Sequence, residues 1–193
     1  MAGIIVSGDT SGAVTLQAPA VAGTVTVTLP AASGTMLTTA SSGQSIPKAA
    51  LPTGSVLQVV NATFSTAQTT TSTSYQASGL TLSITPTSNT SKILITGAVP
   101  YDVYGGSSNQ ATLALYKGAT NLMTNGFAII ASGGSNEIQS GSMAVNFLDS
   151  PATTSSTTYT IYFRVAPTAG GTPTARIFVD NYTGTLTAME IAA

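Results

Sequence analysis

The 193-residue chain has no cysteine, no histidine and no tryptophan, and only 6% of its residues are charged. The lack of cysteine excludes disulfides, thiolate metal sites and cysteine nucleophiles. The lack of histidine removes the most common general base and the most common imidazole metal ligand. The five Lys and Arg residues are scattered singly, whereas phosphate binding needs clustered basic groups, so we expect no nucleic-acid partner.

Long apolar runs are also missing. No stretch approaches the roughly 20 apolar residues of a membrane span, so we expect no membrane insertion. The N-terminus, MAGIIVSGDTSG, has neither a charged segment nor a long apolar run, so we expect no signal peptide.

Groups that carry catalysis are scarce as well. The sequence holds no G-x-S-x-G motif, and its carboxylates are few and far apart: Asp9, Asp102, Glu137, Asp149, Asp180 and Glu190. The segments at Asp102/Asn109 and Asp180/Asn181 offer only two oxygen ligands each, which is too few to predict a Ca²⁺ site. We therefore expect no enzymatic activity, no metal and no cofactor.

Hydroxyl and β-branched residues take the place of charge. The chain has 34 Thr and 23 Ser, and 42% of its residues are hydrophobic. This composition favours strands, and the net charge of −1 gives little repulsion between copies. We expect an all-β protein that associates with itself.

A short repeat stands near the N-terminus. Residues 12–20, GAVTLQAPA, align with residues 23–31, GTVTVTLPA, and five of the nine positions are identical. Apolar and polar residues alternate in both units, which is typical of half-buried strands. The residues expected to contact sister subunits or a docking partner are Val14, Leu16, Val25, Val27 and Leu29. A hairpin that packs on the chain's own domain is the alternative.

The pattern predicts three parts: an N-terminal β-strand arm (1–39, including a strand at 3–7), a linker (40–54) and a head (55–193). Strands are predicted in the head at 55–64, 74–86, 92–104, 110–118, 126–132, 138–148, 157–166, 175–181 and 185–192. Short strands at this spacing favour a jelly-roll-like β-sandwich, with an up-and-down barrel as the alternative. The predicted core residues are Ile93, Ile95, Leu113, Leu115, Ile129, Phe147, Ile161, Phe163, Ile177 and Val179.

One segment of the head combines aromatic and polar residues. VPYDVYGGSSNQ, residues 99–110, offers Tyr101, Asp102, Tyr104 and Asn109 for a loop at one end of the sandwich. Tyrosine rings beside polar groups are suited to sugars, so these four residues are a candidate host-contact loop. A tyrosine pair that borders the core is the alternative.

Three stretches carry a resemblance to a known group of proteins. The N-terminal SGDTSGAVTLQAPAVAGTVTVTLPAASGTMLTT resembles segments of virion appendage proteins from tailed phages, especially marine and cyanobacterial ones. VLQVVNATFST…TSTSYQASGLTLSITPTSNTSKILITGAV and the C-terminal TTYTIYFRV…TLTAMEIAA are similar to the head domain that follows in those proteins. The resemblance implies a homotrimer with β-rich heads that decorates the virion or binds host surfaces.

Two functions are compatible with this resemblance. Two repeat units are too few for a fibre shaft, and we expect a free-standing protein that begins at Met1, so the first function is a trimeric decoration (cement) protein. It would be made in the host cytoplasm and would bind the major capsid protein on the capsid exterior. The alternative is a short tail fibre that binds a tail or baseplate protein and recognises host cell-surface polysaccharide.

Overall fold

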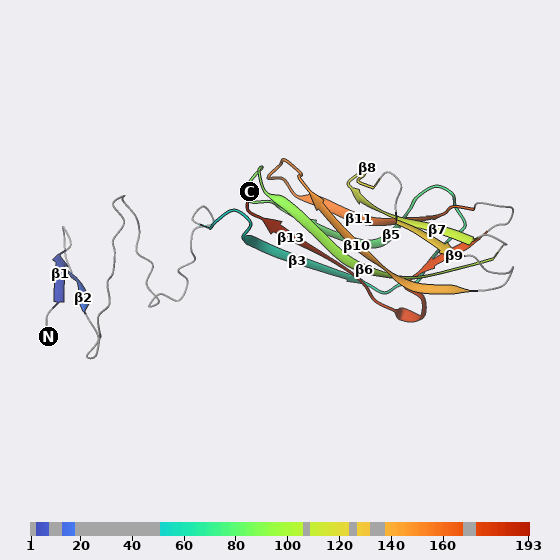
Figure 1. Ribbon diagram of the computed structural model, residues 1–193, viewed down its shortest axis with the longest axis horizontal. Helices are drawn as coiled ribbons and strands as arrows, with labels where there is room; N and C mark the ends of the chain where they lie inside the picture. The colour runs from blue at the N-terminus through green and yellow to red at the C-terminus, as the bar shows by residue number, and fades with distance from the viewer. Residues whose placement is uncertain are drawn as a thin grey trace. The chain divides into compact units, whose positions relative to one another are not determined.

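The computed structural model describes residues 3–7, 13–17, 51–105, 109–123, 127–131, 138–167 and 173–193 (Figure 1). The chain divides into two compact units, Met1–Ser45 and Ile46–Ala193. In the first unit, the predicted strands at β1 (Gly3–Ser7) and β2 (Ala13–Gln17) are present, and they pair antiparallel. The second repeat unit lies outside the described residues.

The second unit consists of strands wherever the period-two alternation is clear. Its strands are β3 (Val56–Phe64), β4 (Gln68–Thr70), β5 (Gln76–Ile84), β6 (Lys92–Tyr104), β7 (Asn109–Lys117), β8 (Thr120–Asn121), β9 (Phe127–Ala131), β10 (Gln139–Asp149), β11 (Thr157–Val165), β12 (Thr174–Ile177) and β13 (Gly184–Ile191). The short strands β4 and β8 were not predicted, because they hold few apolar residues. The predicted strand 175–181 ends early, at Ile177.

These strands form two antiparallel sheets that face each other across the core (Figure 1). In the first sheet, β6 pairs with β10 along one edge and with β13 and β12 along the other. β3 lies beyond β13, and β4 lies beyond β12. The second sheet has the order β5, β11, β7, with β8 and β9 sharing the far edge of β7.

This order is that of a jelly roll. Taken along the chain, the strands fill eight positions, of which the first (β3 with β4), the fifth (β8 with β9) and the last (β12 with β13) are each split in two. Positions 1, 8, 3 and 6 form one sheet, and positions 2, 7, 4 and 5 form the other. An up-and-down barrel would pair each strand only with its neighbours in sequence and the first strand with the last, so the pairings of β6 with β13 and of β5 with β11 rule out that alternative.

The core between the sheets contains most of the side chains predicted to fill it. Ile93, Ile95, Leu113, Leu115, Ile161, Phe163 and Ile177 are buried. Phe147 is partly exposed but packs against the same cluster, and the side chain of Ile129 lies outside the described residues.

Val179 is the exception, because it is only partly buried, while its neighbour Phe178 is fully buried. Phe178 has a left-handed backbone (φ 57°) and leads into a 3-10 turn, Val179–Asn181. This turn ends the alternation of β12, so the prediction of Val179 as a core residue is wrong. No helix within the described ranges is long and apolar enough to cross a membrane.

Candidate functional site

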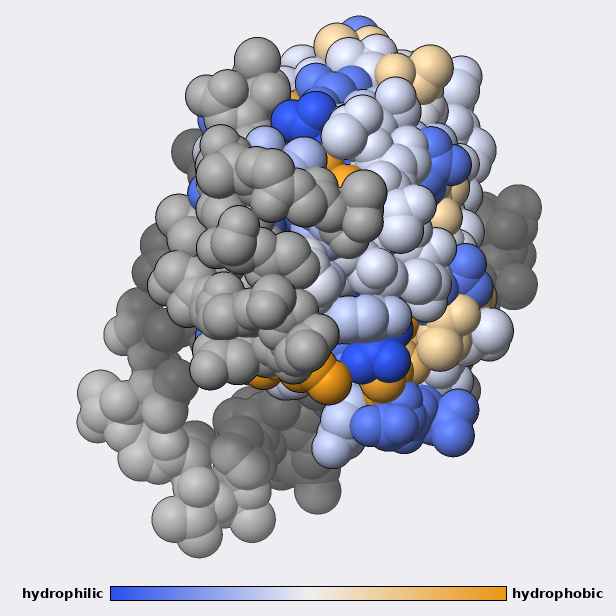
Figure 2. Space-filling view, turned by 90° about the vertical axis from the view of Figure 1, so that its right-hand side faces the viewer, coloured by the Kyte–Doolittle hydropathy of each residue, from blue (hydrophilic) through white to orange (hydrophobic). Residues whose placement is uncertain are grey.

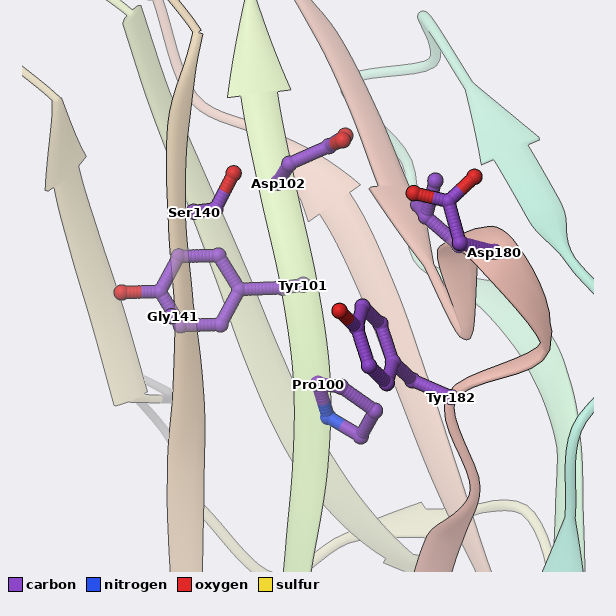
Figure 3. A pocket seen from close by; sticks show the side chains of 8 residues that line it. Pro100, Tyr101, Asp102, Ser140, Gly141, Asp180 and Tyr182 are labelled. Carbon is purple, nitrogen blue, oxygen red and sulfur yellow. The ribbon is translucent and has the colours of Figure 1, made fainter.

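A cleft of about 350 Å³ opens beside β6 and includes two of the predicted contact residues (Figure 3). Its lining consists of Pro100, Tyr101, Asp102, Ser140, Gly141, Val179, Asp180 and Tyr182. The ring of Tyr101 lies over Gly141 of β10, where an added Cβ would come 2.8 Å from the phenolic oxygen (Figure 3). Glycine at position 141 therefore gives this ring room to lie across the neighbouring strand.

Asp102 is held in an ion pair at the side of the cleft. Arg176 of β12 donates from Nε to Oδ1 (2.7 Å) and from Nη2 to Oδ2 (2.5 Å). The hydrogen bonds to Asp102 raise the pKa of Arg176, although burial of the guanidinium opposes this. Because both carboxylate oxygens of Asp102 already accept from Arg176, this residue joins β6 to β12 and is poorly placed to bind a ligand or Ca²⁺.

Of the other two predicted contact residues, Tyr104 is not part of the cleft lining. The Tyr104 ring carries the Arg176 guanidinium 4.7 Å from its centroid. Asn109 begins β7, and its side chain lies outside the described residues. Tyr101, Asp102 and Tyr104 all belong to β6, so the expectation that they line a loop is corrected: they lie on a strand.

The buried carboxylates take part in contacts that stabilise the fold. Asp149 accepts from the Tyr159 hydroxyl (2.7 Å) and from Lys117 (3.0 Å). Glu190 accepts from Gln58 Nε2 (2.6 Å) and from the amide and hydroxyl of Thr87 (2.7 Å each). Among the residues that the structure describes, no group of three or more acidic side chains could hold a metal ion.

A row of apolar side chains crosses the outer face of the first sheet. Register places Val59 of β3 beside Met189 of β13, Met189 beside Leu94 of β6, and Leu94 beside Leu148 of β10. Val59 is 58% exposed and Leu148 is 52% exposed. Directly paired side chains lie about 5 Å apart, so this row forms one continuous strip across four strands.

The strip extends at one end and stops at the other. Ile191 pairs with Val56, which is 51% exposed, so both join it. We call these six residues (Val56, Val59, Leu94, Leu148, Met189 and Ile191) the apolar patch. On its other side the next row is polar and consists of Asn61, Thr187, Thr96 and Asn146. The patch therefore has a sharp boundary on this side.

Outside the patch, the large hydrophobic side chains that are strongly exposed among the described residues are Ile138 (56%) and Tyr182 (64%). Figure 2 shows one face of the molecule, on which most described residues are pale and only small areas are strongly hydrophilic or hydrophobic. This agrees with the abundance of Ser and Thr. Against such a background, a six-residue apolar patch is a distinct feature.

Of the predicted arm contacts, Val14 and Leu16 lie within described strands. Val14 pairs with Val6, and Leu16 pairs with Ile4. Apolar residues thus stand opposite apolar residues in this two-stranded sheet. Val25, Val27 and Leu29 lie outside the described residues.

Sequence reasoning missed the apolar patch. Each member occupies an outward position of a predicted strand, and alternation identifies such positions. Only the register reveals that four of them form one row, because the strands involved are separated by up to about 130 residues. The one hint in the sequence was the presence of valines, Val56 and Val59, at outward positions of β3.

No protein-family model matches the chain, and no curated protein matches it. Two structures from infectious bursal disease virus resemble it. The structure of the Gx strain aligns with a TM-score of 0.33 and 16% identity, over 72% of this chain and 39% of that chain. The crystal structure of the VP2 subviral particle aligns with a TM-score of 0.28 and 15% identity, over 72% and 38%. This chain spans about two fifths of the length of those chains, and similarity at this level carries no argument about function.

Proposed function

We propose that the chain is a structural protein of a tailed-phage virion, namely a homotrimeric decoration protein that binds the major capsid protein on the capsid exterior. The observation that carries this proposal is the apolar patch. Contiguous exposed apolar side chains on a soluble domain mark a protein contact, and low charge permits close packing of identical copies. The patch is the surface through which the sandwiches associate.

The first unit supports a docking role. A two-stranded sheet such as β1–β2 is marginal in water and needs a partner to cover it. Its paired apolar residues would gain most from contact with another protein. In this proposal residues 1–39 form the docking arm, 40–54 the linker and 55–193 the head.

The patch is tested with two charge-adding double variants of the full chain. Light scattering on the wild type is expected to give about three times 19.2 kDa. Val59→Lys with Leu148→Lys places two charges in the patch and is expected to give a monomer. Thr63→Lys with Ala144→Lys is the matched control, because it adds the same charges to exposed positions of β3 and β10, two rows away.

The light-scattering masses test both the trimer and the surface that forms it. A monomeric patch variant beside a trimeric control variant would assign the contact to the patch. A wild type that is monomeric at micromolar concentration overturns the trimer, and a patch variant that still trimerises overturns the assigned surface.

A tail appendage that recognises host polysaccharide is the second candidate, and the tyrosine-lined cleft is the observation that favours it. Copy number separates the two functions. Gel densitometry of purified virions should give hundreds of copies for a decoration protein and a few dozen at most for an appendage. Removal of residues 1–39 should abolish incorporation into virions, and incorporation that persists would contradict the docking role of the arm.

A further inference from the structure

Three tyrosines gather on the outer face of the second sheet, on the opposite side of the sandwich from the apolar patch. Tyr162 of β11 stacks on Tyr116 of β7, with 4.1 Å between ring centroids and 29° between ring planes. Tyr75, just before β5, meets Tyr116 edge-on at 5.8 Å. Each of the three is partly exposed.

These rings are not part of the core. On β11 the alternate positions Ile161 and Phe163 are buried between the sheets, which leaves Tyr162 on the outside. Tyr162 stands between Ala77 of β5 and Ala114 of β7 in the register. These two small neighbours leave space around the ring, which is partly exposed.

Arg164 is fixed at the edge of the cluster. Its guanidinium lies 4.7 Å from the centroid of Tyr75, and it donates to Thr112 Oγ1 (3.1 Å) and to the Thr73 carbonyl (3.2 Å). Thr112 in turn donates to the Tyr75 hydroxyl (3.3 Å). Within the described part of the chain, these bonds use two of the five N–H donors of an arginine. They hold the guanidinium in place, so little conformational entropy is lost if a ligand binds to it.

Hydroxyl groups continue the same face beside the rings. Thr81 and Thr160 pair across the strands at 2.8 Å, and Ser83 pairs with Thr158 at 2.7 Å. Burial, together with the neighbouring Tyr75 and Tyr162, raises the pKa of Tyr116, so its phenol remains neutral near pH 7. The face therefore combines flat rings, neutral hydroxyls and one cation.

We propose that Tyr75, Tyr116, Tyr162 and Arg164 form a tyrosine platform that binds carbohydrate, in particular a pyranose ring of a polysaccharide. The apolar C–H face of a pyranose stacks on aromatic rings, while its hydroxyls accept from a guanidinium and exchange hydrogen bonds with Thr and Ser. Tyrosine supplies this contact area at a low entropic cost. The single cation is too little for a nucleic acid.

The platform is distinct from the sequence-predicted residues at Tyr101 and does not rest on the proposed capsid role. Because it lies on the sheet opposite the apolar patch, both surfaces can be occupied at once. A carbohydrate bound there would lie on the side that faces away from a patch contact.

The test uses the full-length chain and three immobilised probes: maltohexaose, chitohexaose and hexagalacturonate. At least one is expected to bind, and the same oligosaccharide in solution should shift the NMR signals of tyrosine ring protons. Tyr162→Ala is expected to lower the affinity about tenfold, whereas Tyr162→Phe, which keeps the ring, should retain most of it.

Ile138→Ala is the control, because Ile138 is 56% exposed and belongs neither to the platform nor to the cleft lining, and it should leave binding unchanged. Tyr182→Ala tests the cleft on the other sheet as the rival site. Absence of binding to all three probes at millimolar concentration would overturn the proposal, and so would loss of binding with Tyr182→Ala instead of Tyr162→Ala. Thermal unfolding of each variant separates lost binding from lost folding, and light scattering on the same samples tests the trimer independently.

Discussion

Gly79 illustrates how a single residue limits what the sheet accepts. Its backbone has φ +84°, a conformation that side chains rarely adopt, and an added Cβ would come 2.5 Å from Phe64 Cζ. The pairing of β5 with β11 is irregular at the same place, between Thr160 and Tyr162. Glycine here accommodates both the bulge and the ring of Phe64.

Gly79→Ala is therefore expected to lower the free energy of unfolding by about 2 kcal/mol, because backbone strain and overlap with the ring act together. Gly54→Ala is its control, since Gly54 has φ +90° with nothing within 4 Å of an added Cβ. It should cost about 1 kcal/mol from strain alone. Urea unfolding of both variants measures the difference, and equal losses would contradict a steric role of Phe64.

Glu190 is a fully buried carboxylate with a full set of donors. Burial alone would raise its pKa, but hydrogen bonds from Thr87 and Gln58 outweigh burial and lower the pKa to about 2. A pKa lowered by folding stabilises the native state above the unfolded pKa of 4.5. That stabilisation, about 3 kcal/mol, is lost as the pH falls from about 4.5 to about 2.

Glu190→Gln should flatten this acid dependence. The variant is expected to be less stable than the wild type at pH 7 and to approach it near pH 2, because protonation removes the advantage of the carboxylate. Asp180→Asn changes an exposed carboxylate and should leave the profile close to that of the wild type. Urea unfolding between pH 7 and pH 2 checks both, and parallel profiles for Glu190→Gln and wild type would contradict the assignment.

At the scale of elements, the turn after β12 decides which aromatic residue enters the core. Phe178 packs edge-on against Phe64, with 5.3 Å between ring centroids, and an added Cβ at Gly184 would overlap the Phe178 ring. The left-handed backbone at Phe178 turns its side chain inward at the point where alternation would bury Val179.

Phe178→Ala is therefore expected to cost at least about 3 kcal/mol, because it leaves a cavity beside Phe64. Val179→Ala should cost less than about 1 kcal/mol, since Val179 is partly exposed. Thermal or urea unfolding of the two variants compares adjacent positions directly. A larger loss at Val179 would contradict the observed turn.

This contrast shows what a single sequence can predict here. Alternation identified the β6 residues Ile93 and Ile95 as core, because strand side chains point to opposite faces with period two. It could not locate the turn at Phe178, since positive φ at a phenylalanine has no signature in the sequence. The platform was missed for a related reason: Tyr75, Tyr116 and Tyr162 are far apart in sequence and meet only through strand pairing.

At the scale of the whole molecule, topology was the least accessible property. Most of the strands could be predicted from alternation and from the turn residues between them, whereas the pairing of β3 with the last strand of the chain could not. Because the apolar patch depends on that pairing, the candidate contact surface could be found only after the fold was known.

Because the chain carries little charge, we expect the proposed trimer to be insensitive to salt. A contact through the apolar patch holds few ions, so salt should screen little of it. The mass from light scattering is expected to stay constant between about 50 mM and about 1 M NaCl. A trimer that dissociates as salt is raised would point to an ionic contact and contradict the role of the patch.

Hydrogen bonds join the beginning of the sandwich's polypeptide segment to its C-terminal end. The Gly54 amide donates to the Ala192 carbonyl (2.8 Å), and the Ala192 amide donates to the Ser55 carbonyl (2.9 Å). The two ends of this polypeptide segment are therefore adjacent. We expect the same fold to form if these ends are joined and the chain is opened elsewhere. A circular permutant that joins Ala193 to Leu51 and opens at the exposed Ser155–Ser156 turn should fold with a circular dichroism spectrum like that of the parent.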